Sequence, residues 1–324
     1  MLPGIYKKEG VKMDNRKKNK TKKNWSHYLP FYLMFLPGFV YLLINNYIPL
    51  YGLQLAFKSF SFKKGITGSK WVGLKNFEFL FKTNDAFIMI RNTIGYNVLW
   101  IIIGVVFGVS VAILFNEIRG KMAKKIYQTA ILLPYLMSMV VVAYLVYAFL
   151  ATDTGLVNNA IVKGLMGKSK GIAWYGEPKY WPFILTFVQQ WKQIGFGMLL
   201  YLSTIVGIDK SYYEAAMLDG ATKWQQIKLI TLPLLKPTII MLMILNIGQI
   251  FRSDFGLFYQ VPMNQGVLYS ATQTIDTYVY RALLQTPNYG MSAAASFLQS
   301  IVGFVFIVAA NAIVRKIDEN SSLF

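Results

Sequence analysis

Amide and aromatic side chains recur within two long apolar segments of the chain, at residues 181–206 and 238–258. Separations of three and four residues place many of them along one face of the helix that each segment predicts. The candidates are Gln189, Gln190, Trp191, Gln193, Asn246 and Gln249. An amide both donates and accepts hydrogen bonds, as sugar hydroxyls require, and a ring such as Trp191 or Tyr147 can pack against the CH face of a pyranose. This pattern suits a surface that binds a sugar.

The same amides have a second interpretation, because Gln and Asn often hydrogen-bond between neighbouring membrane helices. Counted inward at about 1.5 Å per residue, the amides of the two segments reach similar depths, where polar groups are costly unless they face protein or water. We therefore expect one shared cavity, used for substrate contact or for helix association. Two cations, Lys192 and Arg252, lie in these segments as well. They could pair with Asp153, Asp254 or a partner subunit, or bind an acidic sugar.

The composition of the chain predicts that these segments lie in a lipid bilayer. Of the 324 residues, 55% are hydrophobic and 15% are charged, and the mean hydropathy is +0.42. The apolar residues cluster into six stretches, each long enough to cross a hydrocarbon core of about 30 Å as a helix. The stretches are 28–53, 94–115, 127–150, 181–206, 238–258 and 291–314. We expect an all-α integral membrane protein with six transmembrane helices, which excludes a soluble enzyme.

The net charge of +19 follows the expected topology of these helices. Residues 1–25 carry nine basic side chains against two acidic ones, and a basic run directly before an apolar span marks the cytoplasmic side. An even number of spans then puts both termini in the cytoplasm. We expect a basic cytoplasmic tail at 1–27, a membrane domain at 28–316 and a second cytoplasmic tail at 317–324. Topology in a lipid membrane therefore explains the positive charge. We expect membrane lipid as a partner and no nucleic acid.

Side chains that most catalytic and metal sites need are scarce in this sequence. The chain has no Cys and a single His, His27, which removes Cys-ligated metals, His clusters and Ser-His-Asp catalysis. The only Gly-Lys-Ser run, at 167–169, lacks the first glycine of a P-loop, because Val162 stands in its place. We therefore expect no enzymatic activity, no metal and no cofactor in this chain.

The segment 207–237, between the fourth and fifth apolar stretches, predicts a helix, a break and a second helix. A helix-forming run ends at Leu218, and Gly220 can adopt the positive φ that a sharp reversal needs. Apolar residues then recur at helical spacing from Trp224 until Pro233. By these residues alone, the segment is an amphipathic connector that rests on the membrane surface.

The same segment resembles the EAA coupling motif of binding-protein-dependent ABC importers. That motif reads Glu-Ala-Ala, three residues, Gly, nine residues, Ile-x-Leu-Pro, and each fixed position has its match in this chain. The matching residues are Glu214, Ala215, Ala216, Gly220, Ile230, Leu232 and Pro233. Two further segments, Gly73–Phe77 and Leu132–Pro134, are similar to the sugar-type permeases of that family. The resemblance covers about residues 28–316.

The resemblance implies the type I ABC importer permease fold and a function in carbohydrate import. It implies a heterodimer with a second permease and two ATPase subunits that hold ATP and Mg²⁺. It also implies an external, lipid-anchored binding protein that delivers an oligosaccharide. The chain would be a multi-pass subunit in a bacterial plasma membrane and would form half of the translocation pathway.

Individual residues receive roles from the same resemblance. Glu214 and Asp219 would face basic groups of the ATPase, Gly220 would form the turn, and three alanines would allow close approach. These alanines are Ala215, Ala216 and Ala221.

In the related maltose-type permeases, the sugar site uses the span before the coupling loop and the outer end of the preceding span. This carries over to Gln189 and Gln190, and more weakly to Asp153 and Thr154. An importer of another solute, such as a peptide or a polyol phosphate, stays an alternative. A stand-alone channel or secondary carrier is a more distant one, since it would not need the coupling motif.

Overall fold

A computed structural model of the chain defines its fold. It describes residues 25–82, 84–167, 169–285, 287–317 and 322–323. The expected basic tail therefore lies almost wholly outside the described residues, as does most of the expected C-terminal tail. The chain divides into two units, residues 1–51 and 52–324.

The first unit ends within a long apolar helical stretch, Tyr28–Phe57. It contains α1 (Trp25–Leu42) and the π-helical turn η1 (Leu43–Tyr47), and η2 (Ile48–Phe57) continues from it into the second unit. The described apolar side chains of α1 are largely exposed. Such a surface suits a helix that faces lipid or a partner subunit.

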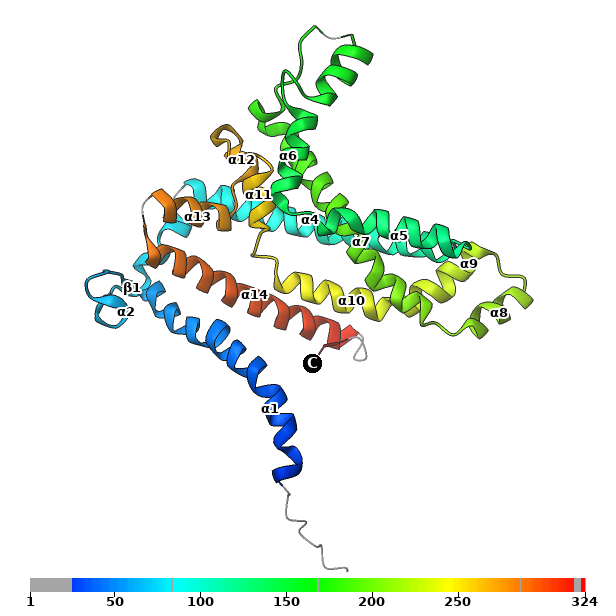
Figure 1. Cartoon of the computed structure of the whole chain (residues 1–324), viewed down its shortest axis with the longest axis horizontal. Coiled ribbons are helices and arrows are strands. Elements are labelled where there is room, and N and C mark those ends of the chain that lie inside the picture. The colour runs from blue at the N-terminus through cyan, green and yellow to red at the C-terminus, as the bar shows by residue number, and fades with distance from the viewer. Residues whose placement is uncertain (1–24, 83, 168, 286, 318–321, 324) are drawn as a thin grey trace, which may run out of the picture. The chain divides into compact units, whose positions relative to one another are not determined.

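Four long apolar helices form the centre of the second unit. They are α4 (Asn84–Asn116), α7 (Trp181–Val206), α10 (Leu232–Gly248) and α14 (Tyr289–Ile317). α4 packs along α7, and α10 packs along α14, where Figure 1 shows the last two side by side. Buried side chains such as Val109, Met198 and Leu235 join α4, α7 and α10 in one core cluster.

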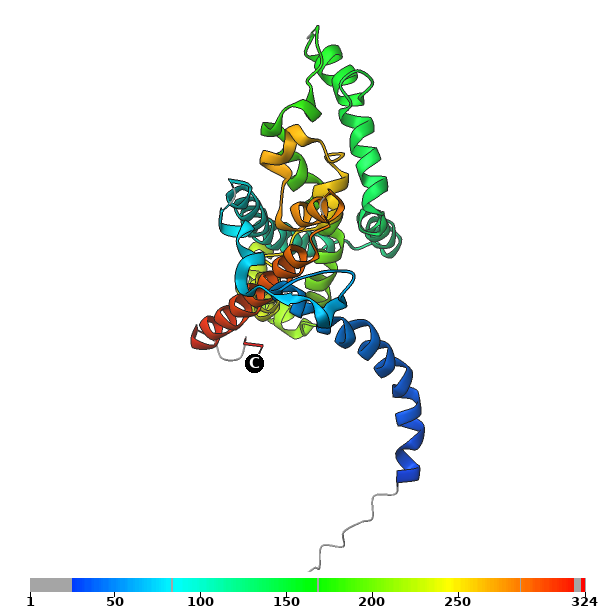
Figure 2. The same ribbon diagram turned by 90° about the vertical axis from the view of Figure 1, so that its left-hand side faces the viewer.

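Two helix pairs of this unit are bent sharply at short breaks. α5 (Lys121–Leu136) meets α6 (Met139–Leu150) at 98°, and α6 turns away from the bundle in both views (Figure 1 and Figure 2). The stretch Pro178–Val206, which contains α7, meets α8 (Lys210–Leu218) at 69°. The described residues thus hold four helices long and apolar enough to cross a membrane, or up to six if each bent pair is one span.

Two of the expected apolar segments have different bounds in the structure. The second begins ten residues earlier than expected, because α4 starts at Asn84. The fifth is expected at 238–258, but the apolar helical stretch runs over Lys223–Gly248. Pro233 does not end this stretch, because it follows a π-helical turn, η7 (Ile227–Thr231), and such local adjustments accommodate a proline in a membrane helix. A separate short helix, α11 (Phe255–Gln260), follows instead of a continuous span.

The remaining described elements are short and flank these helices. Before α4 lie β1 (Lys58–Ser59), α2 (Gly65–Gly68), β2 (Lys70–Trp71), η3 (Gly73–Phe77) and α3 (Phe79–Lys82). Before α7 lie η4 (Val157–Leu165), η5 (Trp174–Gly176) and η6 (Pro178–Tyr180). Before α10 lie α9 (Lys223–Gln226) and η7 (Ile227–Thr231). Before α14 lie α11, η8 (Gly266–Leu268), α12 (Tyr269–Thr272) and α13 (Ile275–Gln285). Among the described residues, only the two-stranded antiparallel β1/β2 ribbon differs from the expected all-α fold.

Candidate functional site

A cavity of about 430 Å³ lies among α4, α7 and α10. Its amide lining comprises Gln189, Gln190 and Gln193 of α7, Asn246 and Gln249 at the end of α10, and Asn97 of α4. The amides of the two apolar segments therefore share one cavity, as their depths predict. The rings of Trp100, Phe196 and Tyr201 also line it, and none of the described lining residues is Asp, Glu, Lys or Arg. The cavity therefore combines neutral amides with a largely apolar lining.

Asn97 is the lining amide that the sequence interpretation leaves out. Its Nδ2 atom donates to the carbonyl oxygens of Thr93 at 2.8 Å, Ile250 at 3.0 Å and Arg252 at 2.8 Å. Asn97 therefore fixes the turn after α10 to the wall of the cavity. The available signal is a carboxamide inside the strongly apolar segment 94–115.

Hydrogen bonding inside the cavity is incomplete. Gln190 Nε2 reaches the Trp100 carbonyl oxygen at 3.4 Å. The Oε1 atom of Gln189 is buried and has no hydrogen-bond partner among the described residues. A buried acceptor left unpaired costs about 1–3 kcal/mol unless a ligand or water donates to it. Because the Gln189 side chain lines the cavity, rotation of its amide would bring this acceptor to a ligand hydroxyl.

The other four sequence candidates lie away from this cavity. Trp191 packs against a core cluster between α6, α7 and α11. The Tyr147 ring of α6 makes an edge-on contact with the Tyr175 ring, with 5.5 Å between centroids. Asp153 and Thr154 are exposed in the turn after α6. The structure therefore brings together five of the nine candidates.

The two cations of the apolar segments do not pair with carboxylates of the described residues. Lys192 Nζ donates to three backbone carbonyls at the end of α5. Arg252 reaches Ser300 Oγ at 3.3 Å. Asp254 caps the N-terminus of α11 with its side chain. Among the described residues neither cation pairs with Asp153 or Asp254: backbone carbonyls bind Lys192, a hydroxyl binds Arg252, and Asp254 caps α11.

The segment that resembles the coupling motif forms α8, a tight turn and α9, as its sequence predicts. Gly220 has a φ of +77°, the left-handed conformation that glycine adopts without steric cost. The Ala221 N–H donates to the Ala216 carbonyl oxygen at 2.8 Å and closes the end of α8. Thr222 then starts α9 in a capping box with Gln225. Local hydrogen bonds therefore define the turn on both sides.

Side chains of this helix-turn-helix are mostly exposed, and no described residue of α8 is buried. Glu214, Ala215, Asp219, Gly220 and Pro233 are exposed, whereas Ala216, Ala221, Ile230 and Leu232 are half-buried. Leu218 and Trp224 retain 90% and 70% of their accessible surface. The base of the segment is closed by the Tyr213 hydroxyl and Thr231 Oγ1, 2.9 Å apart. Large apolar side chains that stay exposed, such as Leu218 and Trp224, are typical of an interaction surface.

Electrostatic contacts at this segment are weak and exposed. Lys223 and Glu117 form an ion pair at 3.3 Å, and both side chains are about half exposed or more. At the start of α8, Asp209 Oδ1 accepts from the Ser211 N–H at 2.9 Å. Hydrogen bonds from Ser211 hold the pKa of the Asp209 carboxyl below its ordinary value. The carboxylate is therefore the N-cap of α8.

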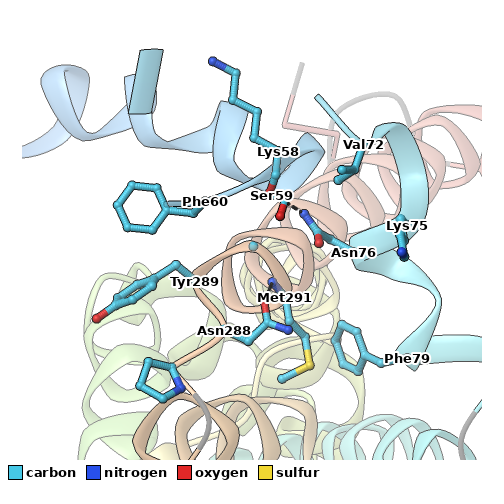
Figure 3. Close-up of a pocket in the computed structure, with 12 residues that line it drawn as sticks. Lys58, Ser59, Phe60, Val72, Lys75, Asn76, Phe79, Asn288, Tyr289 and Met291 are labelled. Atoms are coloured by element: carbon cyan, nitrogen blue, oxygen red, sulfur yellow. Dashed lines mark hydrogen bonds between the residues drawn. The ribbon is translucent and has the colours of Figure 1, made fainter. Parts of the chain in front are cut away.

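A second cavity, of about 600 Å³, lies between the β1/β2 ribbon, η3 and the start of α14 (Figure 3). Phe60 and Tyr289 line it, and Lys58 is directed away from it (Figure 3). Lys58 Nζ donates to Gln54 Oε1 at 2.7 Å, and Asn76 Nδ2 donates to three carbonyl oxygens of the preceding chain. These polar side chains of the second cavity therefore stabilise the local fold, and the amide cavity is the stronger candidate site.

The Gly-Lys-Ser run is described only in part, because Lys168 lies outside the described residues. Gly167 has a φ of +63°, and Val162 is buried. Among the residues that the structure describes, no three His, Cys, Asp or Glu side chains gather as a metal site.

Comparisons with known proteins agree with this geometry. Residues 104–319 match the family model of the binding-protein-dependent transport system inner membrane component. The polygalacturonan/rhamnogalacturonan transport system permease protein YteP of Bacillus subtilis (strain 168) is 35% identical over 321 residues, covering 97% of this chain and 94% of that protein.

A chain of a bacterial alginate ABC transporter, solved in complex with an alginate pentasaccharide-bound periplasmic protein, matches with a TM-score of 0.80 and 32% identity. That match covers 91% of this chain and 97% of the other. A second structure, of a bacterial ABC transporter involved in the import of the acidic polysaccharide alginate, gives a TM-score of 0.81 and 33% identity over 91% and 98% of the two chains. The chain therefore belongs to the family of inner membrane components of binding-protein-dependent transport systems, and it is a multi-pass membrane protein.

Proposed function

We propose that this chain is a permease subunit of an ATP-driven oligosaccharide importer and that the amide cavity is part of its translocation pathway. The five expected amides that line one uncharged cavity carry this proposal, and the Gln189 Oε1 atom, which has no partner among the described residues, would accept from a sugar hydroxyl after rotation of its amide. Relatives named for polygalacturonan, rhamnogalacturonan and alginate are 32–35% identical and support a glycan more strongly than a 27% identical sn-glycerol-3-phosphate permease supports a polyol phosphate.

The cavity suits a glycan through hydrogen bonds and ring contacts instead of charge. Each amide presents a donor and an acceptor, and Trp100, Phe196 and Tyr201 present apolar faces to the CH groups of a sugar ring. Tyr147, Asp153 and Thr154 would meet the glycan only before it reaches this cavity. Trp191 supports α7 from its packed side.

The proposed assembly is that of the family. Six spans place both termini in the cytoplasm, with tails at 1–27 and 317–324 around a membrane domain at 28–316. A second permease completes a heterodimer, and the exposed apolar surface of α1 supports such a contact or contact with lipid. Two ATPase subunits hold ATP and Mg²⁺, and a lipid-anchored binding protein supplies the oligosaccharide.

Coupling would run from the ATPases through α8 to the cavity. Glu214 and Asp219 would bind basic groups of the ATPase, while the alanines at 215, 216 and 221 would allow close approach around the Gly220 turn. Only residues 207–209 separate α7 from α8, so a displacement of α8 reaches α7 directly. ATP binding would thereby open the cavity outward, and hydrolysis would reset it.

Reconstitution of the complete transporter in proteoliposomes tests this proposal. The measurements are ATP hydrolysis and uptake with acidic and neutral oligosaccharides, peptides and polyol phosphates. We expect oligosaccharides to stimulate hydrolysis. We expect Gln189→Ala to lower uptake about tenfold, since one lost buried hydrogen bond corresponds to about 1.4 kcal/mol.

The matched control is Gln128→Ala, which removes an amide from α5 outside the cavity lining. Its uptake should equal that of the unaltered chain. Stimulation by peptides or polyol phosphates alone would assign another solute class. Uptake without ATP would assign a channel or secondary carrier.

A further inference from the structure

Lys192 is a buried cation in the middle of the apolar helix α7. Its exposed fraction is 8%, and no carboxylate of the described residues pairs with it. A lone charge inside a membrane protein is costly unless other groups compensate it, and such residues usually have a specific role. The cavity lining does not include Lys192. Its role is therefore to be sought in what its ammonium group contacts.

Backbone carbonyl groups at one end of α5 compensate this charge. Lys192 Nζ lies 3.3 Å from the Pro134 oxygen, 2.9 Å from the Tyr135 oxygen and 2.5 Å from the Met137 oxygen. An ammonium group has three N–H donors, so each donor has one acceptor. The geometry uses the full donor capacity of the side chain.

These carbonyl groups lie where the helix hydrogen bonds of the third apolar stretch are interrupted. The last four carbonyls of an α-helix lack intrahelical partners and carry the negative end of the helix dipole. Here α5 ends and α6 departs at 98°. Ser138 caps the start of α6, because its Oγ accepts from the Val141 N–H at 3.4 Å. At the end of α5, the Met137 N–H donates to the Pro134 carbonyl oxygen at 3.2 Å, and Lys192 caps the same end from another helix.

The last turns of α5 also pack on α7 around Lys192. A Cβ atom on Gly195 would lie 2.2 Å from the Ile131 carbonyl oxygen, so only glycine permits this approach of the two backbones. The rings of Tyr135 and Phe196 stack at 4.9 Å with an angle of 8° between their planes. Charge, backbone and ring contacts therefore join the same short sections of two helices.

The joined section of α7 is also the section that lines the cavity. Gln189, Gln190 and Gln193 flank Lys192 along the chain, and α7 continues toward α8. A helix break without caps is free to bend, whereas a break whose carbonyls are bound to a neighbouring helix has to move with that helix. The contacts of Lys192 thus connect the bend to the proposed route of coupling.

We propose that Lys192 is a positioning residue that locks the end of α5 to α7, so that the α5/α6 bend and the amide wall of the cavity move as one body during transport. This inference rests on the proposed function, since it assigns a part of the coupling route. Without the lock, α7 and its amides would still follow α8, but the end of α5 and the bent helix α6 would not move with them, so the two sides of the pathway would lose their coordination.

Uptake per ATP hydrolysed in the complete transporter is the first test. Lys192→Met keeps an unbranched side chain that is one atom shorter and removes its donors, and we expect it to lower this ratio about tenfold while hydrolysis continues. Lys192→Arg keeps a cationic donor in a larger, planar group and should retain more of the ratio than Lys192→Met. The control Lys170→Met removes an exposed lysine from the loop before α7 and should change nothing. An unchanged ratio in Lys192→Met, or failure of Lys192→Arg to improve on it, would overturn the lock.

Disulfide cross-linking gives a second test that does not need transport. The chain has no native Cys, so Tyr135→Cys combined with Phe196→Cys has no background within it. We expect equal cross-linking in the resting and ATP-trapped states, and loss of that equality when Lys192→Met is added. A cross-link confined to one state in the otherwise unaltered chain would show that the helices separate and would refute the inference. Absent oligosaccharide stimulation would instead refute the proposed function, and the cross-linking result would still stand.

Discussion

The two sharp helix bends found in the described residues differ in where their contacts come from. At the bend between α5 and α6, Lys192 and Gly195 bring α7 into contact with the breaking helix, and the freed carbonyls have partners within the chain. At the bend between α7 and α8, no described residue of α8 is buried. Leu218, at the end of α8, is almost fully exposed. The first bend has its polar groups bound within this chain, and the second leaves its side chains exposed.

We call the bend between α5 and α6 the closed bend and the bend between α7 and α8 the open bend. This difference predicts that the closed bend stays fixed and that the open bend moves. A corner whose backbone groups are satisfied inside one chain loses hydrogen bonds if it opens, and each buried group left unpaired costs about 1–3 kcal/mol. A corner held by exposed contacts such as the Lys223–Glu117 pair loses little, because exposed ion pairs contribute about 0–1 kcal/mol. Under the proposed function, α8 would receive the force and α5 and α7 would transmit it.

The largest effect is expected at the turn of the open bend. Gly220 has a φ of +77°, and a β-branched residue pays at least about 1–2 kcal/mol there. Gly220→Val should therefore distort the turn between α8 and α9 and lower oligosaccharide uptake by at least about tenfold. Uptake and oligosaccharide-stimulated ATP hydrolysis in proteoliposomes measure this effect.

Gly167 offers a control with matched backbone strain. It has a φ of +63° in the loop after η4, and a Cβ atom at either glycine would meet nothing within 4 Å. Gly167→Val should therefore carry the same local cost without the loss of uptake. Equal losses from the two variants would mean that general strain, and not the position in the coupling segment, explains the result.

At the closed bend, the expected effect is on stability. The Cβ atom of Gly195→Ala would approach the Ile131 carbonyl oxygen to 2.2 Å, and a backbone atom cannot move aside as a flexible side chain can. We expect a loss of about 1–3 kcal/mol in the free energy of unfolding, seen as a lower midpoint of thermal inactivation of the purified transporter. Gly95→Ala in α4 is the control, because its Cβ would meet nothing within 4 Å. Equal midpoints for the two variants would contradict the close packing of α5 on α7.

The open bend is the part of the site that the sequence predicts well, because its determinants are local. Gly220, Thr222 and Gln225 interact within a few residues, so their types and spacing predict the turn and the start of α9. The shared amide cavity is predicted for a similar reason. Helical periodicity and depth in the membrane place Gln189 and Asn246 without knowledge of their neighbours.

The closed bend escapes prediction, because its acceptors are backbone groups. Lys192 lies 55 to 58 residues from the carbonyls that it binds, and a carbonyl has no signature in the sequence. A search for side-chain partners therefore points to Asp153 and Asp254, which is wrong. Asn97 is missed for the same reason, since it bonds to the carbonyl of Ile250 and two others.

The smallest expected effect concerns the cap of α8. The pKa of the Asp209 carboxyl lies below its ordinary value because the carboxylate accepts from Ser211, so the cap is fully formed above the ordinary pKa and is lost only as the pH falls through the lowered one. Between about pH 5 and pH 8, hydrogen exchange of 210–218 should therefore show no change in cap stability. Asp209→Ala should speed exchange in the first turn of α8 by about two- to fivefold, whereas Asp209→Asn, an equally good cap, should preserve it. Because the cap belongs to the open bend, exchange at the α5/α6 bend should stay the same in both variants. A change at both bends would mean that the two are not independent, and the distinction between a fixed closed bend and a movable open bend would then fail.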